Sequence, residues 1–267
     1  MSTPSTTADP WSLSGKSAVV TGASRGIGKA IAIHLARKGL ENIAITYASN
    51  KAAADDTLEA CRALGVKKAT AIRADALDPA VWPGVITQSL ADLGVDTIHI
   101  LVNNAVLGDP AYYRASSELT PDSFASVMLA NVYAPVATAV AFMEHAAPKN
   151  AGGGGGRVIN ISSISGTGTC AEPLMTYGAS KAALDSYTRS LADTYASDRG
   201  ITFNSVIVGP TATDALHMLL SELPTEAADK LIFETSAAPR FGEPDDIAYI
   251  VGFLASEEGR TTLAALG

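Results

Sequence analysis

Short apolar segments alternate with helix-like segments along most of the 267-residue chain. The apolar segments that predict strands lie at residues 17–22, 42–47, 68–75, 97–105, 157–162 and 201–209. The helical patterns lie at residues 28–40, 53–65, 80–94, 121–147, 177–198 and 244–256. Strands that alternate with helices form a parallel sheet, because each right-handed crossover returns the chain to the same end of the sheet. The order therefore predicts an α/β fold: one Rossmann-like, doubly wound parallel sheet with helices on both faces.

The chain shows no linker that would divide it into two domains. Residues 13–267 are predicted to form a single domain, preceded by a disordered lead at residues 1–12 that lacks the basic start and apolar segment of a secretion signal. Five consecutive glycines interrupt the segment 150–157, NAGGGGGR. Because such a run is entropically costly to order, we expect a flexible surface loop there.

Charge and cysteine content exclude several classes of partner. The formal net charge is −8 and no basic stretch stands out, which argues against nucleic acid. No apolar run is found that reaches the roughly 18 residues that a membrane span needs, so no membrane span is expected, and the scattered histidines show no metal-ligand spacing. Cys61 and Cys170 form no disulfide framework, so a reducing compartment, the cytoplasm, is expected.

A glycine-rich turn, TGASRGIGKA at residues 21–30, closes the first predicted strand and opens the first helix. Its glycines are Gly22, Gly26 and Gly28. Glycines allow a tight turn and a close approach of the backbone to a pyrophosphate, which the free N–H groups of the helix N-terminus can bind. A glycine cluster is a weak signal alone, but its place after the first strand predicts a dinucleotide site.

The end of the second strand indicates which dinucleotide is bound. In many such sites an acidic residue binds the adenosine ribose hydroxyls at this point. Here the strand ends TYASNK at residues 46–51, where Ser49, Asn50 and Lys51 supply no acid, and Arg25 lies in the glycine turn. These residues suit a 2′-phosphate and favour NADP(H) over NAD(H). The alternative is that Arg25 and Lys51 are simply solvated.

The segment YGASK at residues 177–181 places Tyr177 four residues before Lys181, so both lie on one face of a helix. The pair is open to two interpretations. It is either a surface pair, with the lysine stem packed on the ring, or a tyrosine whose pKa is lowered by a neighbouring ammonium so that its proton can be transferred.

Several motifs, in order, make the chain resemble the short-chain dehydrogenase/reductase family from about residue 13 to residue 257. The motifs are TGASRGIG at 21–28, Asp75 after the third strand, NNA at 103–105, Asn131 in the long helix, SS at 162–163, YGASK at 177–181 and RFGEPDDIA at 240–248. Each motif is modestly specific, but the ordered series is not expected by chance. The resemblance implies a single Rossmann-like domain, usually assembled into homodimers or homotetramers.

The resemblance also implies roles for individual residues. The catalytic residues would be Asn131, Ser163, Tyr177 and Lys181. The cofactor-binding residues would be Gly22, Ser24, Arg25, Ile27, Gly28, Ser49, Asn50, Asp75, Asn104, Ala105, Tyr177, Lys181, Val208, Thr211 and Thr213. In the family, the serine holds the substrate oxygen, the tyrosine exchanges its proton, and the asparagine holds a water that links the lysine to solvent. Asp75 would bind the adenine, and Thr211 and Thr213 would lie near the nicotinamide.

The chain departs from the family pattern in four places. Val106 replaces a usual glycine, Val208 replaces a usual proline, and the glycine run lengthens the interval between Asn131 and Ser163. After residue 260 the expected last strand is missing or truncated, which puts one sheet edge in doubt. Residues 214–238, rich in leucine, would form the substrate lid.

These features favour an NADP(H)-dependent oxidoreductase that reduces the carbonyl, or oxidises the secondary alcohol, of a small to medium, fairly apolar substrate. A ketone or 3-oxoacyl reductase, for example one in a biosynthetic pathway, fits best. The alternative is a nucleotide-binding protein of the same fold whose activity is lost or non-redox, as in an isomerase or cyclase. No nucleic acid, membrane or metal is expected as a partner.

Overall fold

The computed structural model describes residues 10–149, 155–221 and 240–260, and within them six parallel strands form one sheet in the order β3-β2-β1-β4-β5-β6. The strands are β1 (Ser17–Val20), β2 (Asn42–Tyr47), β3 (Lys68–Arg73), β4 (Ile100–Asn103), β5 (Arg157–Ile161) and β6 (Thr202–Val206). The order reverses between β1 and β4, so the carboxyl ends of these two strands flank the crevice in which such sheets bind ligands. The predicted fold class is confirmed.

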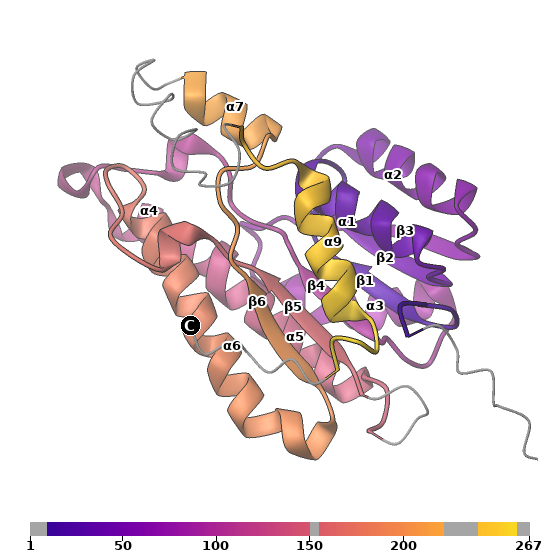
Figure 1. The fold of residues 1–267 in the computed structure, drawn as a ribbon. Coiled ribbons are helices and arrows are strands. Elements are labelled where there is room, and N and C mark those ends of the chain that lie inside the picture. The colour runs from indigo at the N-terminus through magenta and orange to yellow at the C-terminus, as the bar shows by residue number, and fades with distance from the viewer. Residues whose placement is uncertain (1–9, 150–154, 222–239, 261–267) are drawn as a thin grey trace, which may run out of the picture.

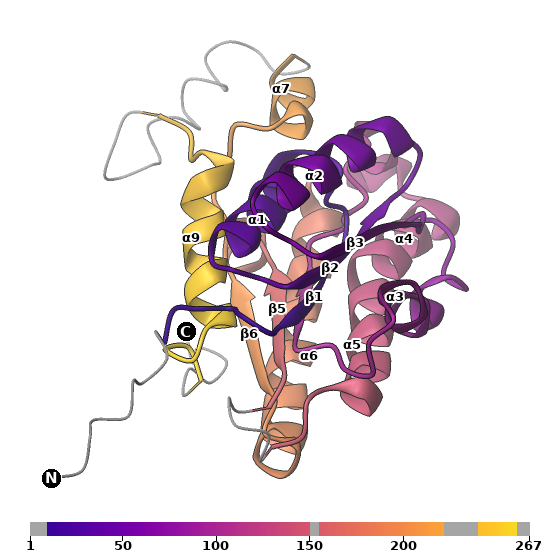
Figure 2. The same cartoon turned by 90° about the vertical axis from the view of Figure 1, so that its right-hand side faces the viewer.

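Helices cover both faces of the sheet (Figures 1 and 2). One face carries α1 (Gly26–Arg37), α2 (Lys51–Ala63) and α9 (Pro244–Ala255), and the other α3 (Val85–Leu93), α5 (Ala134–His145) and α6 (Met175–Arg199). The remaining elements are α4 (Pro121–Met128), α7 (Asp214–Ser221) and short turns η1 (Trp82–Gly84), η2 (Pro110–Tyr112), η3 (Ser116–Glu118) and η5 (Ile164–Gly166). Each face has its own core of buried aliphatic and aromatic side chains, which fixes the sheet between two helical layers.

The long helix predicted at residues 121–147 is interrupted. It begins as expected at Pro121, where the Thr120 side chain accepts from the Ser123 N–H at 3.2 Å in a reciprocal capping box. A π-helical turn, η4 (Leu129–Tyr133), then separates α4 from α5. Such turns contain one extra residue and occur often at functional sites. Here the extra residue falls in the turn that contains Asn131.

The same stretch, Pro121–His145, is long and apolar enough to cross a membrane by length and composition alone, so the prediction that no apolar run reaches this length is wrong. Half of its most apolar 18-residue window is buried inside the structure, and core helices of soluble proteins commonly pass this test. The packing of α5 against the sheet therefore accounts for its apolar composition.

The segment before β1 packs against the domain from Pro10 onward. The Trp11 ring lies 5.8 Å from the Phe253 ring of α9, and the Lys38 ammonium stands 4.4 Å above the Trp11 ring. Pro10 accepts a backbone hydrogen bond from Glu257 at 3.1 Å. The packed part thus begins before residue 13, the predicted start of the domain, while residues 1–9 of the predicted lead lie outside the described residues.

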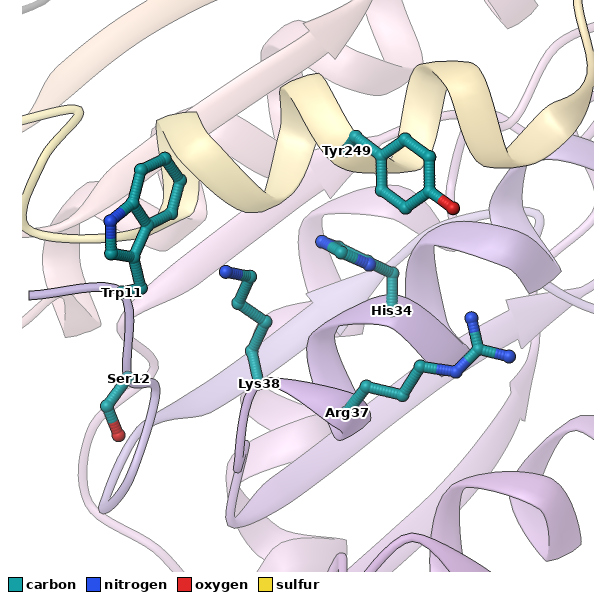
Figure 3. A pocket seen from close by; sticks show the side chains of 6 residues that line it. All are labelled: Trp11, Ser12, His34, Arg37, Lys38 and Tyr249. Carbon is teal, nitrogen blue, oxygen red and sulfur yellow. The ribbon is translucent and has the colours of Figure 1, made fainter. Parts of the chain in front are cut away.

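A cavity of about 430 Å³ lies where α1, α9 and this segment meet (Figure 3). It is lined by Trp11, Ser12, His34, Arg37, Lys38 and Tyr249. The His34 ring stands edge-on to Tyr249 at 5.2 Å, and a Cβ on Gly252 would lie 2.3 Å from His34 Nε2. Burial, assisted by Lys38 and Arg37, lowers the pKa of His34. The cavity is therefore bordered by a neutral histidine clamped between α1 and α9.

Three sequence predictions fall wholly or partly outside the described residues. They concern the glycine loop predicted at 150–157, the lid beyond residue 221, and the missing or truncated last strand, which would involve residues 261–267. Of the predicted loop, residues 150–154 lie outside the described residues, whereas Gly155 and Gly156 are buried, so the prediction of a surface loop is wrong for these two glycines. At the described start of the lid, α7 forms the helix Asp214–Ser221.

Candidate active site

Tyr177 and Lys181 lie one turn apart at the start of α6, next to the carboxyl end of β5. The Lys181 Nζ is 5.8 Å from the centroid of the Tyr177 ring and donates to the carbonyl of Ile161 at 2.9 Å. The lysine is 4% exposed. Since a buried ammonium needs partners, its position beside the phenol and a strand-end carbonyl is fixed, and the interpretation as a surface pair is wrong.

Burial shifts the pKa values of both groups. It raises the pKa of the Tyr177 phenol, while a hydrogen bond with Ser163 acts in the opposite direction. It lowers the pKa of Lys181 to about 8, against the effect of Asp185, which raises it. The lowering of the Tyr177 pKa that the sequence predicted is therefore not found, because desolvation outweighs it. At neutral pH the phenol carries its proton, and most of the lysine carries its charge.

Ser163 follows β5 in extended conformation and begins the short turn η5. Its hydroxyl oxygen accepts from the Ser165 N–H at 3.2 Å, and the residue is 8% exposed. The same hydroxyl lies close enough to the Tyr177 phenol to act on its pKa, so the end of β5 and the start of α6 bring two hydroxyls together. A single oxygen atom of a ligand could contact both hydroxyls.

Asn131, in the π-helical turn, is linked to α6 by hydrogen bonds. Its amide donates to the Ser180 hydroxyl at 3.1 Å, and Ser180 in turn donates to the Tyr177 carbonyl at 2.7 Å. Its amide oxygen accepts from the Leu107 N–H at 3.0 Å. Asn131 thus connects the loop after β4 with the helix that carries Tyr177, and all four predicted catalytic residues lie in one region.

The glycine turn packs closely against the residues that follow β4. Gly22 has a φ of 63°, and a Cβ on it would lie 2.9 Å from the Cα of Ala105. A Cβ on Gly28 would lie 2.5 Å from the Asn104 amide nitrogen, which donates to the carbonyls of Thr21 and Gly22 at 3.0 Å. Only glycine allows this close approach, so Asn104 and Ala105 lie against the predicted phosphate-binding turn.

The first turn of α1 has the properties of an anion site. Arg25 is its N-cap residue, no side chain caps the helix, and the first turn contains no acidic residue. Its N–H groups therefore remain available to a phosphate. The Ser24 carbonyl accepts from Thr57 at 3.4 Å, and Ile27 is half-buried beside the helix start. Arg25 is largely exposed and lies 3.7 Å from Asp214 of α7.

The segment after β2 is in part engaged in structural contacts. Asn50 caps α2 by accepting from the Ala53 N–H at 3.0 Å, Lys51 pairs with Asp55 at 2.7 Å, and Ser49 is exposed. After β3, Asp75 is half-buried, and its carboxylate accepts from the Leu77 N–H at 3.0 Å. The Asn50 amide nitrogen and the Ser49 hydroxyl remain able to reach a ligand.

The segment after β6 lies across the glycine turn. The Val208 carbonyl accepts from the Ile164 N–H at 3.0 Å, and Thr211 forms a parallel bridge with Gly242. Further on, a Cβ on Gly26 would lie 3.5 Å from the methyl group of Thr213. Of the predicted cofactor residues after β6, Thr213 thus lies against the glycine turn, while Val208 belongs to the core.

A family model described as enoyl-(acyl carrier protein) reductase matches residues 22–265. The chain is also 52% identical over 251 residues to the short chain dehydrogenase asqE of Emericella nidulans, which covers 94% of this chain and 91% of that protein. The chain belongs to the short-chain dehydrogenase/reductase family. Its activity is that of an oxidoreductase enzyme of this family.

Other family members are similar over nearly the whole chain. The short chain dehydrogenase penD of Penicillium thymicola is 51% identical and covers 94% of this chain and 89% of its own length. A solved short chain dehydrogenase from Burkholderia cenocepacia, in complex with NADP, has a TM-score of 0.81 at 33% identity, covering 94% of each chain. A metagenomic blue fluorescent protein in complex with NADPH has a TM-score of 0.79 at 36% identity, covering 94% of each chain.

The departures from the family pattern have different structural settings. Val106 is 39% exposed just after β4, whereas Val208 is 7% exposed and belongs to the core on the α1 side. Neither residue disturbs the hydrogen bonds of Ser163, Asn131 or Lys181 described above. The family chemistry of this region is therefore compatible with both valines.

Two residues near the site were not predicted from the sequence. Tyr113 places its ring 5.6 Å from the Tyr177 ring, and Arg73 donates to the Ala48 carbonyl at 3.2 Å beside the predicted adenosine segment. Arg73 could have been found as a cation at the end of the strand that neighbours β2. Nothing in the sequence pairs Tyr113 with Tyr177, since 64 residues separate them.

Proposed function

We propose that this family member uses NADP(H) to reduce the carbonyl group of a small to medium, fairly apolar substrate, in the manner of a ketone or 3-oxoacyl reductase. The observation that carries the proposal is the position of the Lys181 ammonium 5.8 Å from the Tyr177 ring, with the Ser163 hydroxyl close enough to the Tyr177 phenol to act on its pKa. One hydroxyl can hold a carbonyl oxygen while the other gives it a proton. The same site can catalyse the reverse oxidation of an alcohol.

NADPH, when bound, supplies the hydride that reaches the carbonyl carbon. Ser163 donates a hydrogen bond to the carbonyl oxygen and holds it beside Tyr177. Tyr177, protonated at neutral pH because burial raises its pKa, gives its proton to that oxygen. Lys181 stabilises the resulting phenolate, because a neighbouring positive charge favours the charged form of an acid. Asn131 holds the start of α6 through Ser180 and provides an amide for a water that returns the proton.

The residues around the glycine turn fit a dinucleotide phosphate. The uncapped first turn of α1, free of acidic residues, would bind the pyrophosphate. Arg25 is largely exposed, and its partner Asp214 is equally exposed, so a phosphate can replace that weak ion pair. Arg25, with Arg73 beside Ala48 and the donors Ser49 and Asn50, would recognise the 2′-phosphate. Asp75 would bind the adenine, and Thr211 and Thr213 would border the nicotinamide.

Apolar side chains at the carboxyl edge support an apolar substrate. Val106 after β4, Ile164 after β5 and Ile207 after β6 are 39%, 58% and 51% exposed. They follow three neighbouring strands of the sheet, next to the catalytic residues. Exposed apolar side chains that gather beside a reactive site indicate that the ligand covers them.

The proposal is tested by following nicotinamide absorbance with NADPH or NADH and a panel of aryl, alicyclic and 3-oxoacyl ketones. We expect NADPH oxidation with at least one ketone, and a decrease in kcat of about 10²–10⁴-fold in Tyr177→Phe. Cys170→Ser, which changes a residue close to Tyr177, serves as a matched control and should keep most of the activity. Tight NADPH binding without turnover of any ketone would instead support the non-redox or inactive alternative.

We also propose that the chain assembles into a homodimer or homotetramer in the cytoplasm. Helices α4, α5 and α6 and the turn η4 expose large apolar side chains, including Phe124, Tyr133, Val140 and Tyr187, which are 42–50% exposed. Cys61 and Cys170 are both free thiols, as suits a reducing compartment. Light scattering coupled to size-exclusion chromatography should give a dimer or larger, and Val140→Lys with Tyr187→Lys should reduce it; a wild-type monomer would contradict the assembly.

A further inference from the structure

Beside Tyr177 lies a second tyrosine, Tyr113, on the loop between β4 and α4. The two ring centroids are 5.6 Å apart, and the ring planes meet at 65°. This edge-to-face arrangement is favourable for aromatic pairs. Tyr113 is partly buried against the small apolar cluster of Leu107, Val127 and Ala130.

We propose, building on the proposed function, that Tyr113 is a positioning residue for Tyr177 and forms the wall of the substrate site that favours flat carbonyl substrates. The Tyr113 ring limits the directions in which the Tyr177 ring can turn, so the phenol hydroxyl stays beside Ser163. Tyr113 is only partly buried, and its ring stands beside the Tyr177 ring, so it offers an aromatic surface against which a flat substrate ring can pack.

A chain of hydrogen bonds ties Tyr113 to the catalytic residues. The Tyr113 hydroxyl donates to the Leu107 carbonyl, and the Leu107 N–H donates to the Asn131 amide at 3.0 Å. Asn131 continues through Ser180 to the backbone of Tyr177. Tyr113 and Tyr177 are thus joined twice, by their rings and by this chain.

The end of the same loop is fastened to the segment before α6. The Ser116 N–H donates to the Glu172 carboxylate at 2.9 Å, and the Ser116 hydroxyl donates to the Met175 sulfur at 3.3 Å. Met175 is the first residue of α6, two residues before Tyr177. The loop that carries Tyr113 is therefore held at both ends to the elements that carry the catalytic residues.

Tyr113 cannot replace Tyr177 as a proton donor. Burial, together with Tyr177 and Asp109, raises the pKa of Tyr113. Its hydroxyl already donates to the Leu107 carbonyl. Within the described residues, no ammonium stands over the Tyr113 ring, whereas the Lys181 ammonium stands over the Tyr177 ring. Its role is therefore geometric: the ring carries the effect, and the hydroxyl anchors the loop.

The experiment compares Tyr113→Leu, which removes the aromatic ring, with Tyr113→Phe, which removes only the hydroxyl. Tyr112→Leu, at the neighbouring residue of η2, is the matched control. For each variant, kcat and KM are measured with a flat aryl ketone and with a branched aliphatic ketone of similar size, alongside the Kd for NADPH. Melting temperatures show which variants fold.

We expect Tyr113→Leu to lower kcat for the aryl ketone about three- to tenfold, with the Kd for NADPH unchanged. The ratio of kcat/KM between the aryl and the branched ketone should fall, because the wall that favours flat substrates is gone. Tyr113→Phe should retain most of the kcat and the preference, and Tyr112→Leu should match wild type.

Unchanged kcat and unchanged preference in a folded Tyr113→Leu would overturn the inference, as would equal losses in Tyr113→Leu and Tyr113→Phe. If Tyr113→Leu does not fold, Tyr113→Phe and Tyr113→Trp decide: an unaltered preference in the larger Trp variant would overturn the aromatic wall. These results leave the proposed function intact, since that proposal fails separately if wild type reduces no ketone or if Tyr177→Phe stays active.

Discussion

The two sides of the crevice, which we propose bind the nucleotide and carry out catalysis and call the nucleotide side and the catalytic side, are built from different kinds of contact. On the nucleotide side, the backbone makes the shape: Gly22 and Gly28 pack so closely against Asn104 and Ala105 that a Cβ at either glycine would lie within 2.9 Å of them. The groups offered to a ligand there are the N–H groups of an uncapped helix. The nucleotide side therefore depends on the absence of a side chain at Gly22 and at Gly28.

On the catalytic side, buried polar side chains make the shape. Asn131, Ser163 and Lys181 are 1%, 8% and 4% exposed, and each is engaged in at least one hydrogen bond. Removing one member of such a buried network leaves its partners unsatisfied. This difference predicts that substitutions that add atoms should damage the nucleotide side, whereas substitutions that remove atoms should damage the catalytic side.

The largest effect is expected from Lys181→Met, which removes the charge and keeps the length of the side chain. We expect kcat to fall about 10²–10⁴-fold, because the phenolate of Tyr177 loses its stabilising cation. In wild type, kcat/KM should decline above about pH 8, where Lys181 loses its proton, and Lys181→Arg should move that decline to higher pH. An unchanged alkaline limb in Lys181→Arg would exclude Lys181 as its source.

Adding one methyl group should break the nucleotide side. In Gly28→Ala the new Cβ would lie 2.5 Å from both the Asn104 amide and the Gly22 carbonyl, so the turn must open. We expect a loss of about 3 kcal/mol or more in the free energy of unfolding and a large increase in the Kd for NADPH. Gly84→Ala is the control, because nothing lies within 4 Å of its added Cβ. Equal behaviour of the two variants in denaturant titration would contradict this account.

The opposite, amino-terminal edge of the sheet offers a test that spares both sides of the crevice. His99 Nδ1 accepts from the Ser17 N–H at 3.1 Å, and burial, assisted by Lys16, lowers the pKa of His99 from 6.5 to about 4. The unfolded chain therefore binds more protons than the folded chain between these values. Stability should be fully present above pH 6.5 and fall toward pH 4, by an amount on the order of 3 kcal/mol.

The variant His99→Asn, which keeps an acceptor near Nδ1 but does not titrate, measures the histidine's share of that loss. Urea titrations at pH 7 and pH 4.5 should show a smaller difference for the variant than for wild type. Identical pH dependence of the two proteins would rule out His99 as the cause.

The smallest effect is expected from Arg25→Ala, which leaves the backbone of the glycine turn in place. The preference for NADPH over NADH should fall about tenfold, since one exposed contact to the 2′-phosphate is lost. Arg37→Ala, at the other end of α1, is the matched control and should leave the preference unchanged. A wild-type preference for NADH would contradict the assignment of Arg25.

Local sequence signals account for much of the fold. Apolar strand segments, the capping residue Thr120 and the glycine turn act over a few residues, so the strand order along the chain and the start of α4 could be predicted. The strand at 42–47 has the predicted limits, whereas α6 begins at Met175, two residues before its predicted start. The exact residues at which helices and strands begin and end depend on contacts with other elements.

The parts that escaped prediction depend on contacts between distant segments. The π-helical turn at Leu129–Tyr133 leaves the apolar composition of the helix unchanged, so the pattern from 121 to 147 reads as one helix. The contact of Tyr113 with Tyr177 depends on how the loop after β4 folds back, which composition does not encode. The glycine loop, the lid beyond residue 221 and the last strand remain predictions.

The extra residue in the π-helical turn has a consequence for how the chain can change in length. One residue corresponds to about 100° of rotation in an α-helix. Because of the extra residue, the buried face of α5 is rotated by about this angle from where a continuous helix starting with α4 would place it. Deleting one residue between 129 and 133 would restore regular bonding and swing α5 around its axis relative to α4. Phe142, now fully buried, would turn out of the core while Val127 stayed inside. Even a conservative shortening at this point would thus replace the turn that holds Asn131 with a straight helix that no longer fits the sheet.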